Sequence, residues 1–274
     1  MQNYRPTNFQ IMPPGVKNLM IINGLVFLFS LLLQSKYNTS LNQLGGLYPI
    51  KSPNFHYYQV FTHFFLHGST SHIFSNMFTL WMFGTMLENV WGTKRFLIYY
   101  VFTALGASVL HQLVNYAELY QFQQKIMAFV YNPSSETFEN VDINTSHLTE
   151  KGLEIYNGLR GQLASGFTDP QIVESGRALF MQFYDMQLNI PTIGASGAVF
   201  GLLMASLMYF PNTIMFPLPI KLKYYVIAIG CFEVYRGIVN NPGDNIAHFA
   251  HIGGMLFGYL LIKYWNRNLR NKFY

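Results

Sequence analysis

Six apolar runs of nearly membrane-spanning length constrain this chain more than any other feature. They are Leu19–Leu33, Ile73–Leu87, Phe96–Val114, Ala195–Phe210, Tyr224–Val239 and Ala247–Trp265. A helix that crosses a bilayer needs about 20 mostly apolar residues, and the shorter runs reach that length when their flanks are included. Only 11% of the 274 residues are charged, against about 25% in soluble domains. The sequence therefore predicts an all-α membrane protein, a bundle of six transmembrane helices.

The distribution of basic residues predicts the orientation of these helices. The first run is not followed by a small-x-small cleavage site, so we interpret it as a retained helix and not a signal peptide. Six spans place both termini on one side. If that side is the cytoplasm, ten of the 17 basic residues fall in short cytoplasmic segments, as the positive-inside rule requires. We expect a multi-pass protein of the bacterial cell (inner) membrane. The scattered positive charges predict no nucleic-acid partner.

A long polar segment interrupts the bundle between the third and fourth runs. It defines four parts: helices 1–3 with the first outer loop in 1–116, an extracytoplasmic insertion in 117–190, helices 4–6 in 191–265, and a basic cytoplasmic tail in 266–274. Within the insertion, Thr168-Asp169-Pro170 is typical of a helix start, with Asp as the cap and Pro in the first turn. The residues 117–131 extend the third span outward, and 132–149 are predicted as loop. The insertion is therefore expected to be helical.

Polar residues inside the apolar runs are the candidates for function, because such groups usually face a bundle interior or a water-filled cavity. Ser196 begins the fourth run, and His251 lies near the start of the sixth. His72 and Asn76 are four residues apart and share one helical face. In the predicted orientation all four lie near the outer ends of their spans. The fourth run covers about 24 Å, less than the ~30 Å hydrocarbon core, so Ser196 is expected to be recessed.

The four residues are suited to acyl transfer. A serine hydroxyl becomes a nucleophile when a histidine takes its proton. Backbone N–H groups at a helix start, with His72 and Asn76 as side-chain donors, can stabilise an oxyanion. No Asp or Glu lies near His251 in its own span, so the pattern predicts a Ser–His dyad without a third member.

Three motifs in this order resemble those of the rhomboid intramembrane serine proteases. "GASG" at Gly194–Gly197 is similar to the family's G-x-S-G motif, and "AHIGGMLFG" at Ala250–Gly258 to its A-H-x-x-G-x-x-x-G motif. "HFFLHGSTSHIFSN" at His63–Asn76 resembles the family's histidine-rich approach to the second helix. The resemblance implies a rhomboid-like bundle, Ser196 as nucleophile, His251 as base, and His72 and Asn76 in the oxyanion hole.

The resemblance also implies supporting roles for other residues. His67 is a structural loop residue, and Glu88 steadies the inner end of the second span. Phe200, where some relatives have tyrosine, can stack on His251 from one turn below. Close helix contact and substrate approach are expected from the small residues Gly194, Gly197, Gly254 and Gly258.

The sequence leaves simpler interpretations open. Taken alone, Ser196 is a helix cap or packing residue, and His248 is structural or cavity-lining. Glu233 pairs with Arg236, extends outward to solvent, or contacts a gating element. The single cysteine, Cys231, lies in an apolar run and is expected in the core. A zinc protein or metal transporter would use the histidines 63, 67, 72, 248 and 251, but these spacings lack carboxylate partners.

The expected function is that of a serine endopeptidase that cleaves transmembrane protein substrates in the bilayer, near its outer face, through an acyl-enzyme. The alternative is an inactive rhomboid-like protein for client binding or quality control. Neither a cofactor nor a metal is expected.

Overall fold

The computed structural model describes residues 9–143, 145, 148–166, 169–215, 219–239 and 247–270. Its elements, in chain order, are α1 (Pro14–Tyr37), α2 (Leu41–Gly45), α3 (Gln59–Thr62), the 3₁₀ turn η1 (His63–Phe65), α4 (Thr70–Thr79), the π-helical turn η2 (Leu80–Gly84), α5 (Thr85–Trp91), α6 (Thr93–Tyr131), α7 (Ser135–Glu139), α8 (Glu150–Ala164), α9 (Pro170–Leu188), α10 (Ser196–Tyr209), β1 (Ile214–Met215), β2 (Ile220–Lys221), α11 (Leu222–Val239) and α12 (His248–Arg270). The protein is thus mostly helical, as predicted, with two short antiparallel strands among the described residues.

Each of the six apolar runs coincides with a helix or, for the second run, with the continuous stretch α4–η2–α5. Of the described helices, α1 and α6 are long and apolar enough to cross a membrane, and α10 is a shorter apolar helix. The number of spans and the four domain boundaries stay predictions. The first eight residues, Thr168 and the last four residues of the predicted tail lie outside the described residues.

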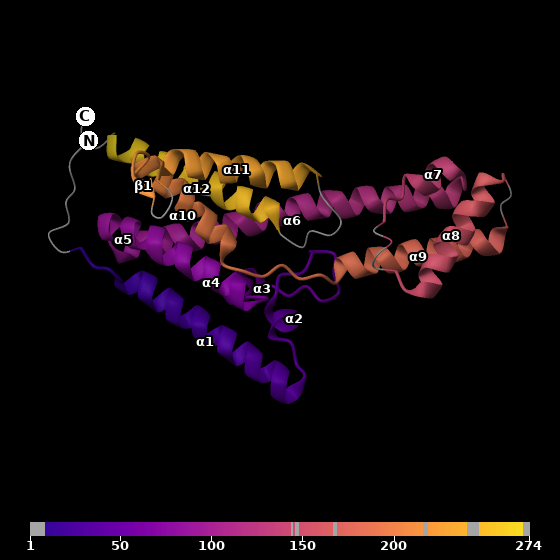
Figure 1. Cartoon of the computed structure of the whole chain (residues 1–274), viewed down its shortest axis with the longest axis horizontal. Coiled ribbons are helices and arrows are strands. Elements are labelled where there is room, and N and C mark those ends of the chain that lie inside the picture. The colour runs from indigo at the N-terminus through magenta and orange to yellow at the C-terminus, as the bar shows by residue number, and fades with distance from the viewer. Residues whose placement is uncertain are drawn as a thin grey trace.

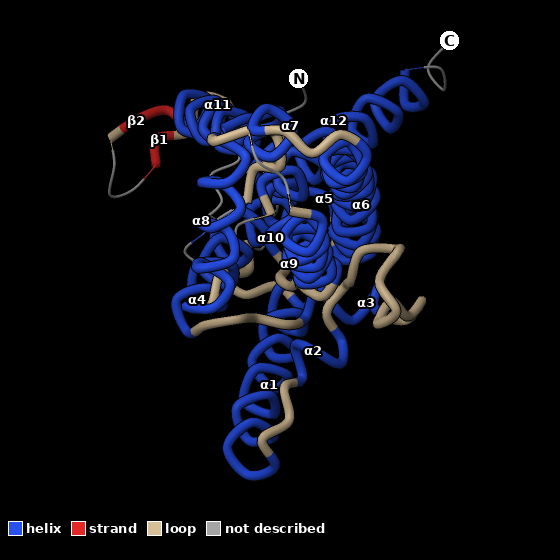
Figure 2. Tube along the Cα trace, turned by 90° about the vertical axis from the view of Figure 1, so that its right-hand side faces the viewer, coloured by secondary structure: helices blue, strands red, loops and turns tan. Residues whose placement is uncertain are grey.

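The helices form a bundle with an extension at one end. Figure 1 shows that α1 begins and α12 ends at the same end of the molecule, whereas α7, α8 and α9 gather at the opposite end beside the far half of α6. α6 packs against α10 in the bundle and against α9 in the extension, while α1 projects away from the other helices at its far end (Figure 2). Both α10 and α12 start on the side of the bundle that is turned toward the extension (Figure 1).

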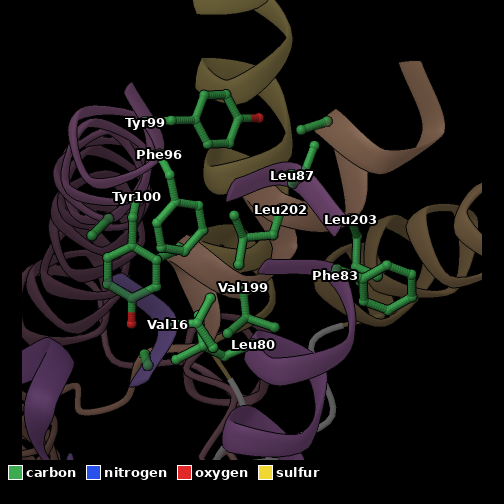
Figure 3. Packing of buried hydrophobic residues seen from close by; sticks show 14 of the residues in the cluster. Val16, Leu80, Phe83, Leu87, Phe96, Tyr99, Tyr100, Val199, Leu202 and Leu203 are labelled. Carbon is green, nitrogen blue, oxygen red and sulfur yellow. The ribbon is translucent and has the colours of Figure 1, made fainter. Parts of the chain in front are cut away.

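A tightly packed core joins α10 to α6, α12 and the second helical stretch. Phe96, Tyr99 and Tyr100 of α6 line the side of the core that faces Leu202 of α10, and all four residues are fully buried (Figure 3). Glycines bring the helix axes close: a Cβ on Gly254 of α12 would collide with the Gly197 carbonyl of α10. Small residues let helices approach in this way where apolar surroundings provide no hydrophobic driving force.

The exterior of the bundle is apolar and its interior holds polar groups. Large apolar side chains on α1 and α11 are exposed, for example Leu32 at 64% and Ile238 at 74%. Asn23, Glu233 and His251, in contrast, are buried. This is the arrangement expected when lipid, and not water, surrounds the helices.

The single cysteine, Cys231, is exposed on α11, so the expected core position is wrong. Its side chain lies on this apolar exterior.

The extension has a hydrophobic core of its own. Phe129 of α6, Phe138 of α7 and Phe180 of α9 are fully buried against one another, with ring centroids 5.4 to 5.9 Å apart. Asp169 caps α9 by accepting from the Gln171 N–H at 2.9 Å, and Pro170 follows in the first turn, as predicted. The predicted loop 132–149 differs from the structure, because the Ser134 capping box starts the short helix α7 there.

Candidate active site

Ser196 is the first residue of α10 and lies at the end of the bundle that carries the extension. Ala195 occupies the N-cap, without a side-chain hydrogen bond, so Ser196 does not cap the helix. The amide groups of the first turn consequently point out of the helix end beside the serine hydroxyl. α10 has only 14 residues, about 21 Å at 1.5 Å per residue, which is shorter than a ~30 Å hydrocarbon core.

The segment before Ser196 is held in place by backbone pairing. Leu47 and Thr192 exchange two backbone hydrogen bonds of 2.9 Å, and the Gly194 N–H donates to the His63 carbonyl at 2.9 Å. Gly194 has φ of 125°, a conformation that favours glycine. A Cβ on it would also lie 2.8 Å from His72 Nε2 and 3.6 Å from Ser196 Oγ. The ring and the hydroxyl therefore flank the same bare backbone position.

His251 lies on α12, one turn from the closest approach between α12 and α10. Its ring stacks on Phe200, with centroids 4.1 Å apart and planes inclined by 5°. Phe200 and Ser196 share one face of α10, since they are four residues apart. Among the described residues, no hydrogen bond joins Ser196 to His251. Such bonds are often long before substrate binds, so the ring's position one turn below the serine is the informative observation.

His72 is oriented by the start of α4. Ser69 caps this helix by accepting from the His72 N–H at 3.1 Å. The Gly68 N–H donates to His72 Nδ1 in a long bond of 3.5 Å. With Nδ1 as acceptor, the proton of the neutral ring is on Nε2, the nitrogen that lies against Gly194. His72 thus presents a donor toward the serine.

Asn76 lies one turn below His72 in α4 and is buried. Its Nδ2 has no hydrogen-bond partner within the described part of the chain. A buried donor without a partner costs about 1–3 kcal/mol, so it requires an explanation. Other buried atoms of the described chain, among them Asn23 Oδ1 and Ser206 Oγ, also lack a partner, so this property alone does not mark a site.

The other loop histidines are buried and have different surroundings. His63 Nδ1 donates to the Gln59 carbonyl at 2.7 Å, and its Nε2 is 2.9 Å from Ser108 Oγ. His67 packs edge-on against His72, with ring centroids 5.1 Å apart. Burial lowers the pKa of both His63 and His67 to about 4, and for His67 the nearby His72 contributes further. Both ring nitrogens of His63 are therefore engaged by partners other than Ser196, and those of His67 have no hydrogen-bond partner among the described residues.

A small cavity of about 20 Å³ lies behind Ser196, large enough for about one water molecule. His63, Ser108, His111 and Thr192 line it. His111 Nε2 is 2.7 Å from Thr192 Oγ1. Core residues, among them Phe64, Ala104 and Ala198, complete the lining, so the cavity lies between Ser196 and the bundle core.

A carboxylate from another helix lies against His251, although none lies near it in its own span. Glu233 of α11 is buried, and its Oε2 is 2.9 Å from His251 Nδ1 and 2.6 Å from His248 Nδ1. Outward extension of Glu233 to solvent is therefore wrong. The sequence contained one indication of this, since an ionisable residue inside an apolar run usually faces a bundle interior.

These three residues are also the group, within the described chain, that could hold a metal ion. Their ligand atoms lie within 4.8 Å of one another. Both nitrogen–oxygen distances are, however, those of ordinary hydrogen bonds, which satisfy the buried carboxylate without an ion. The five-histidine metal site is not assembled, because His63, His67 and His72 are not part of this group within the described residues.

The fold is an apolar helical bundle with buried polar side chains, as in a helical membrane protein. Ser196 starts one of its helices, with His72 beside the preceding glycine and His251 stacked one turn along, so this is a candidate hydrolytic site. The model of the Rhomboid domain matches residues 54–121 and 159–267, more than half of the chain. The chain therefore belongs to the rhomboid family. Members of this family are integral membrane proteins and generally serine proteases that act on transmembrane substrates. A search of curated proteins finds no match.

Proposed function

We propose that this protein is an intramembrane serine endopeptidase in which Ser196 is the nucleophile and His251 the general base. The stacking of His251 on Phe200, one helical turn below Ser196, is the observation that carries this proposal. The close approach of Gly254 to the Gly197 carbonyl supports it, because it fixes the distance between the two helices next to both residues.

The reaction would begin when a substrate helix unwinds at the recessed start of α10. Ser196 Oγ attacks the peptide carbonyl carbon while its proton passes to His251 Nε2. The negative oxygen would be stabilised by hydrogen bonds from the first-turn amides, His72 Nε2–H and Asn76 Nδ2–H. The proton then passes to the departing amine nitrogen, the C–N bond breaks, and water hydrolyses the acyl-enzyme.

We further propose that cleavage takes place near the outer membrane face, with both termini in the cytoplasm. The arrangement in Figure 1 is consistent with this, because α10, whose first residue is Ser196, starts away from the end of the bundle where α1 begins and α12 ends. Lys17 lies in the first turn of α1, Lys94 in the first turn of α6 and Lys263 in the second half of α12, as the positive-inside rule requires if these helix ends are cytoplasmic. The substrates would then be transmembrane proteins with a cleavable site just beyond the bilayer.

The test uses purified protein in lipid vesicles with a fluorescently labelled transmembrane substrate, and parallel labelling by a serine-directed fluorophosphonate. Wild-type protein is expected to cleave the substrate and to be labelled, whereas Ser196→Ala and His251→Ala are expected to do neither above background. Equal cleavage by all three would contradict the mechanism. Client binding that survives Ser196→Ala, with no labelling of wild type, would favour the inactive client-binding protein.

A further inference from the structure

The buried carboxylate of Glu233 has no role in a serine–histidine dyad, yet it contacts the proposed base directly. It comes from α11, a helix that the two proposed catalytic residues do not share. Its Oε2 is at hydrogen-bond distance from the Nδ1 atoms of His251 and His248. The carboxylate is 7% exposed, so water does not compete for these contacts.

The chemistry of the contact determines which nitrogen of His251 carries a proton. An ionised carboxylate only accepts hydrogen bonds, so Nδ1 of His251 must be the donor. The neutral ring then has its lone pair on Nε2. That is the nitrogen required to take a proton from a serine hydroxyl, whereas the opposite tautomer could not accept one there.

The orientation of the ring is fixed by the same contact together with the stacking on Phe200. Stacking at 4.1 Å sets the plane of the imidazole but permits rotation within that plane. The 2.9 Å bond from Nδ1 to Glu233 removes this freedom. A base held by two independent contacts on two other helices is preorganised for proton transfer.

We propose, resting on the function proposed above, that Glu233 is a positioning residue that completes a Ser196–His251–Glu233 triad assembled from α10, α12 and α11. The proton of Ser196 moves to His251 Nε2, while the Nδ1 proton stays on nitrogen and its bond to Oε2 is strengthened by the new imidazolium charge. Glu233 is not protonated in the cycle. His248 donates a second hydrogen bond that keeps the carboxylate turned toward His251.

The decisive variant is Glu233→Gln, which keeps the size of the side chain and removes the charge. Its amide can donate to His251 Nδ1, which selects the wrong tautomer. We expect kcat and the fluorophosphonate labelling rate to fall by about 10²–10⁴-fold, with KM nearly unchanged, because the interaction acts on proton transfer and not on substrate binding. Glu233→Asp keeps the carboxylate but shortens its reach, so its kcat is expected to lie between those of Glu233→Gln and wild type.

Glu88→Gln is the matched control, a second buried carboxylate on a transmembrane helix but at the opposite end of the bundle. Glu88 accepts from the backbone N–H groups of Gly15 and Val16, both at 2.8 Å, and from Thr93 Oγ1. Its replacement is expected to lower thermal stability while the labelling rate per folded molecule stays that of wild type.

A separate measurement tests whether a metal ion binds Glu233, His248 and His251. Activity is measured after treatment with a chelator and again after zinc is added back.

Several outcomes overturn the inference. Wild-type kcat in Glu233→Gln contradicts it while the dyad mechanism stands. Absence of labelling in wild type contradicts the proposed function itself. Loss of activity with chelator and recovery with zinc would make the cluster a metal site. If Glu233→Gln does not fold, Glu233→Asp decides: a kcat about 10-fold lower at unchanged KM supports the triad, and an unchanged kcat overturns it.

Discussion

At the scale of single residues, two features of the proposed site are unfavourable for folding. Asn76 has a buried donor without a partner in the described structure, and Gly194 has a backbone conformation that few other residues adopt. Both features cost folding free energy, of order 1–3 kcal/mol for the buried donor. Gly194 lies two residues before Ser196, so the cost of its conformation falls next to the place where we propose that chemistry occurs.

Asn76→Ala therefore should separate activity from stability. The substitution removes a proposed oxyanion donor, so we expect kcat to fall by about 10²–10³-fold. It also removes a buried, unpartnered amide, so thermal stability should stay the same or rise. Cleavage of a labelled transmembrane substrate and thermal unfolding in detergent measure the two effects. Activity and stability lost together would instead indicate a structural role for Asn76.

The glycine at the contact between α10 and α12 gives a second residue-scale prediction. Gly254→Val places a branched side chain where even a Cβ would collide with the Gly197 carbonyl, which is backbone and cannot rotate away. We expect a loss of more than about 2 kcal/mol in unfolding free energy, together with loss of labelling at Ser196. Gly24→Ala on α1 is the control, because a Cβ there meets nothing within 4 Å. Comparable losses in both variants would contradict the close-contact explanation.

At the scale of elements, the length of the apolar runs made the main helices predictable from sequence. Capping residues made some helix ends predictable as well. Apolar runs located the bundle helices, while Asp169-Pro170 located the start of α9. Contacts between helices could not be derived in this way. Glu233 is 18 residues from His251 along the chain, and only the packing of α11 on α12 brings them together. The same holds for the second core, whose aromatic residues come from α6, α7 and α9.

This second core predicts that the extension can be loosened without loss of the site. Phe180→Ala removes a fully buried ring that contacts Phe129 and Phe138, and such truncations cost about 3–5 kcal/mol. We expect faster proteolysis and hydrogen exchange in α7–α9. Fluorophosphonate labelling of Ser196 should persist, because the bundle core around α10 contains other residues. Loss of labelling in the folded bundle would show that the extension supports the active site.

At the scale of the whole molecule, polar groups are collected at one end of an apolar bundle. His63 and His67 lie in the segment between α3 and α4, and the His63 carbonyl accepts a hydrogen bond from Gly194, two residues before Ser196. Both are buried, and burial favours the neutral imidazole over the charged one. The pH dependence of folding is thereby linked to the end of the molecule that carries the site.

The sign of this dependence follows from the lowered pKa values. Burial lowers the pKa of His63 and His67 to about 4, whereas an unfolded histidine titrates near 6.5. Between these values the unfolded chain binds more protons than the folded one, so stability is complete above about pH 6.5 and is lost as the pH falls toward 4. At about 1.4 kcal/mol per pH unit, the full effect is about 3 kcal/mol for each histidine.

Thermal unfolding in detergent, measured at pH 7.5 and at pH 4.5, tests this. Wild-type protein should lose several kcal/mol on acidification, and the double variant His63→Gln/His67→Gln should lose much less, although its stability at pH 7.5 will be lower because the His63 hydrogen bonds are gone. His56→Gln is the control, since it removes an exposed imidazole and leaves both buried ones in place. An equally steep acid dependence in the double variant would place the responsible groups elsewhere in the molecule.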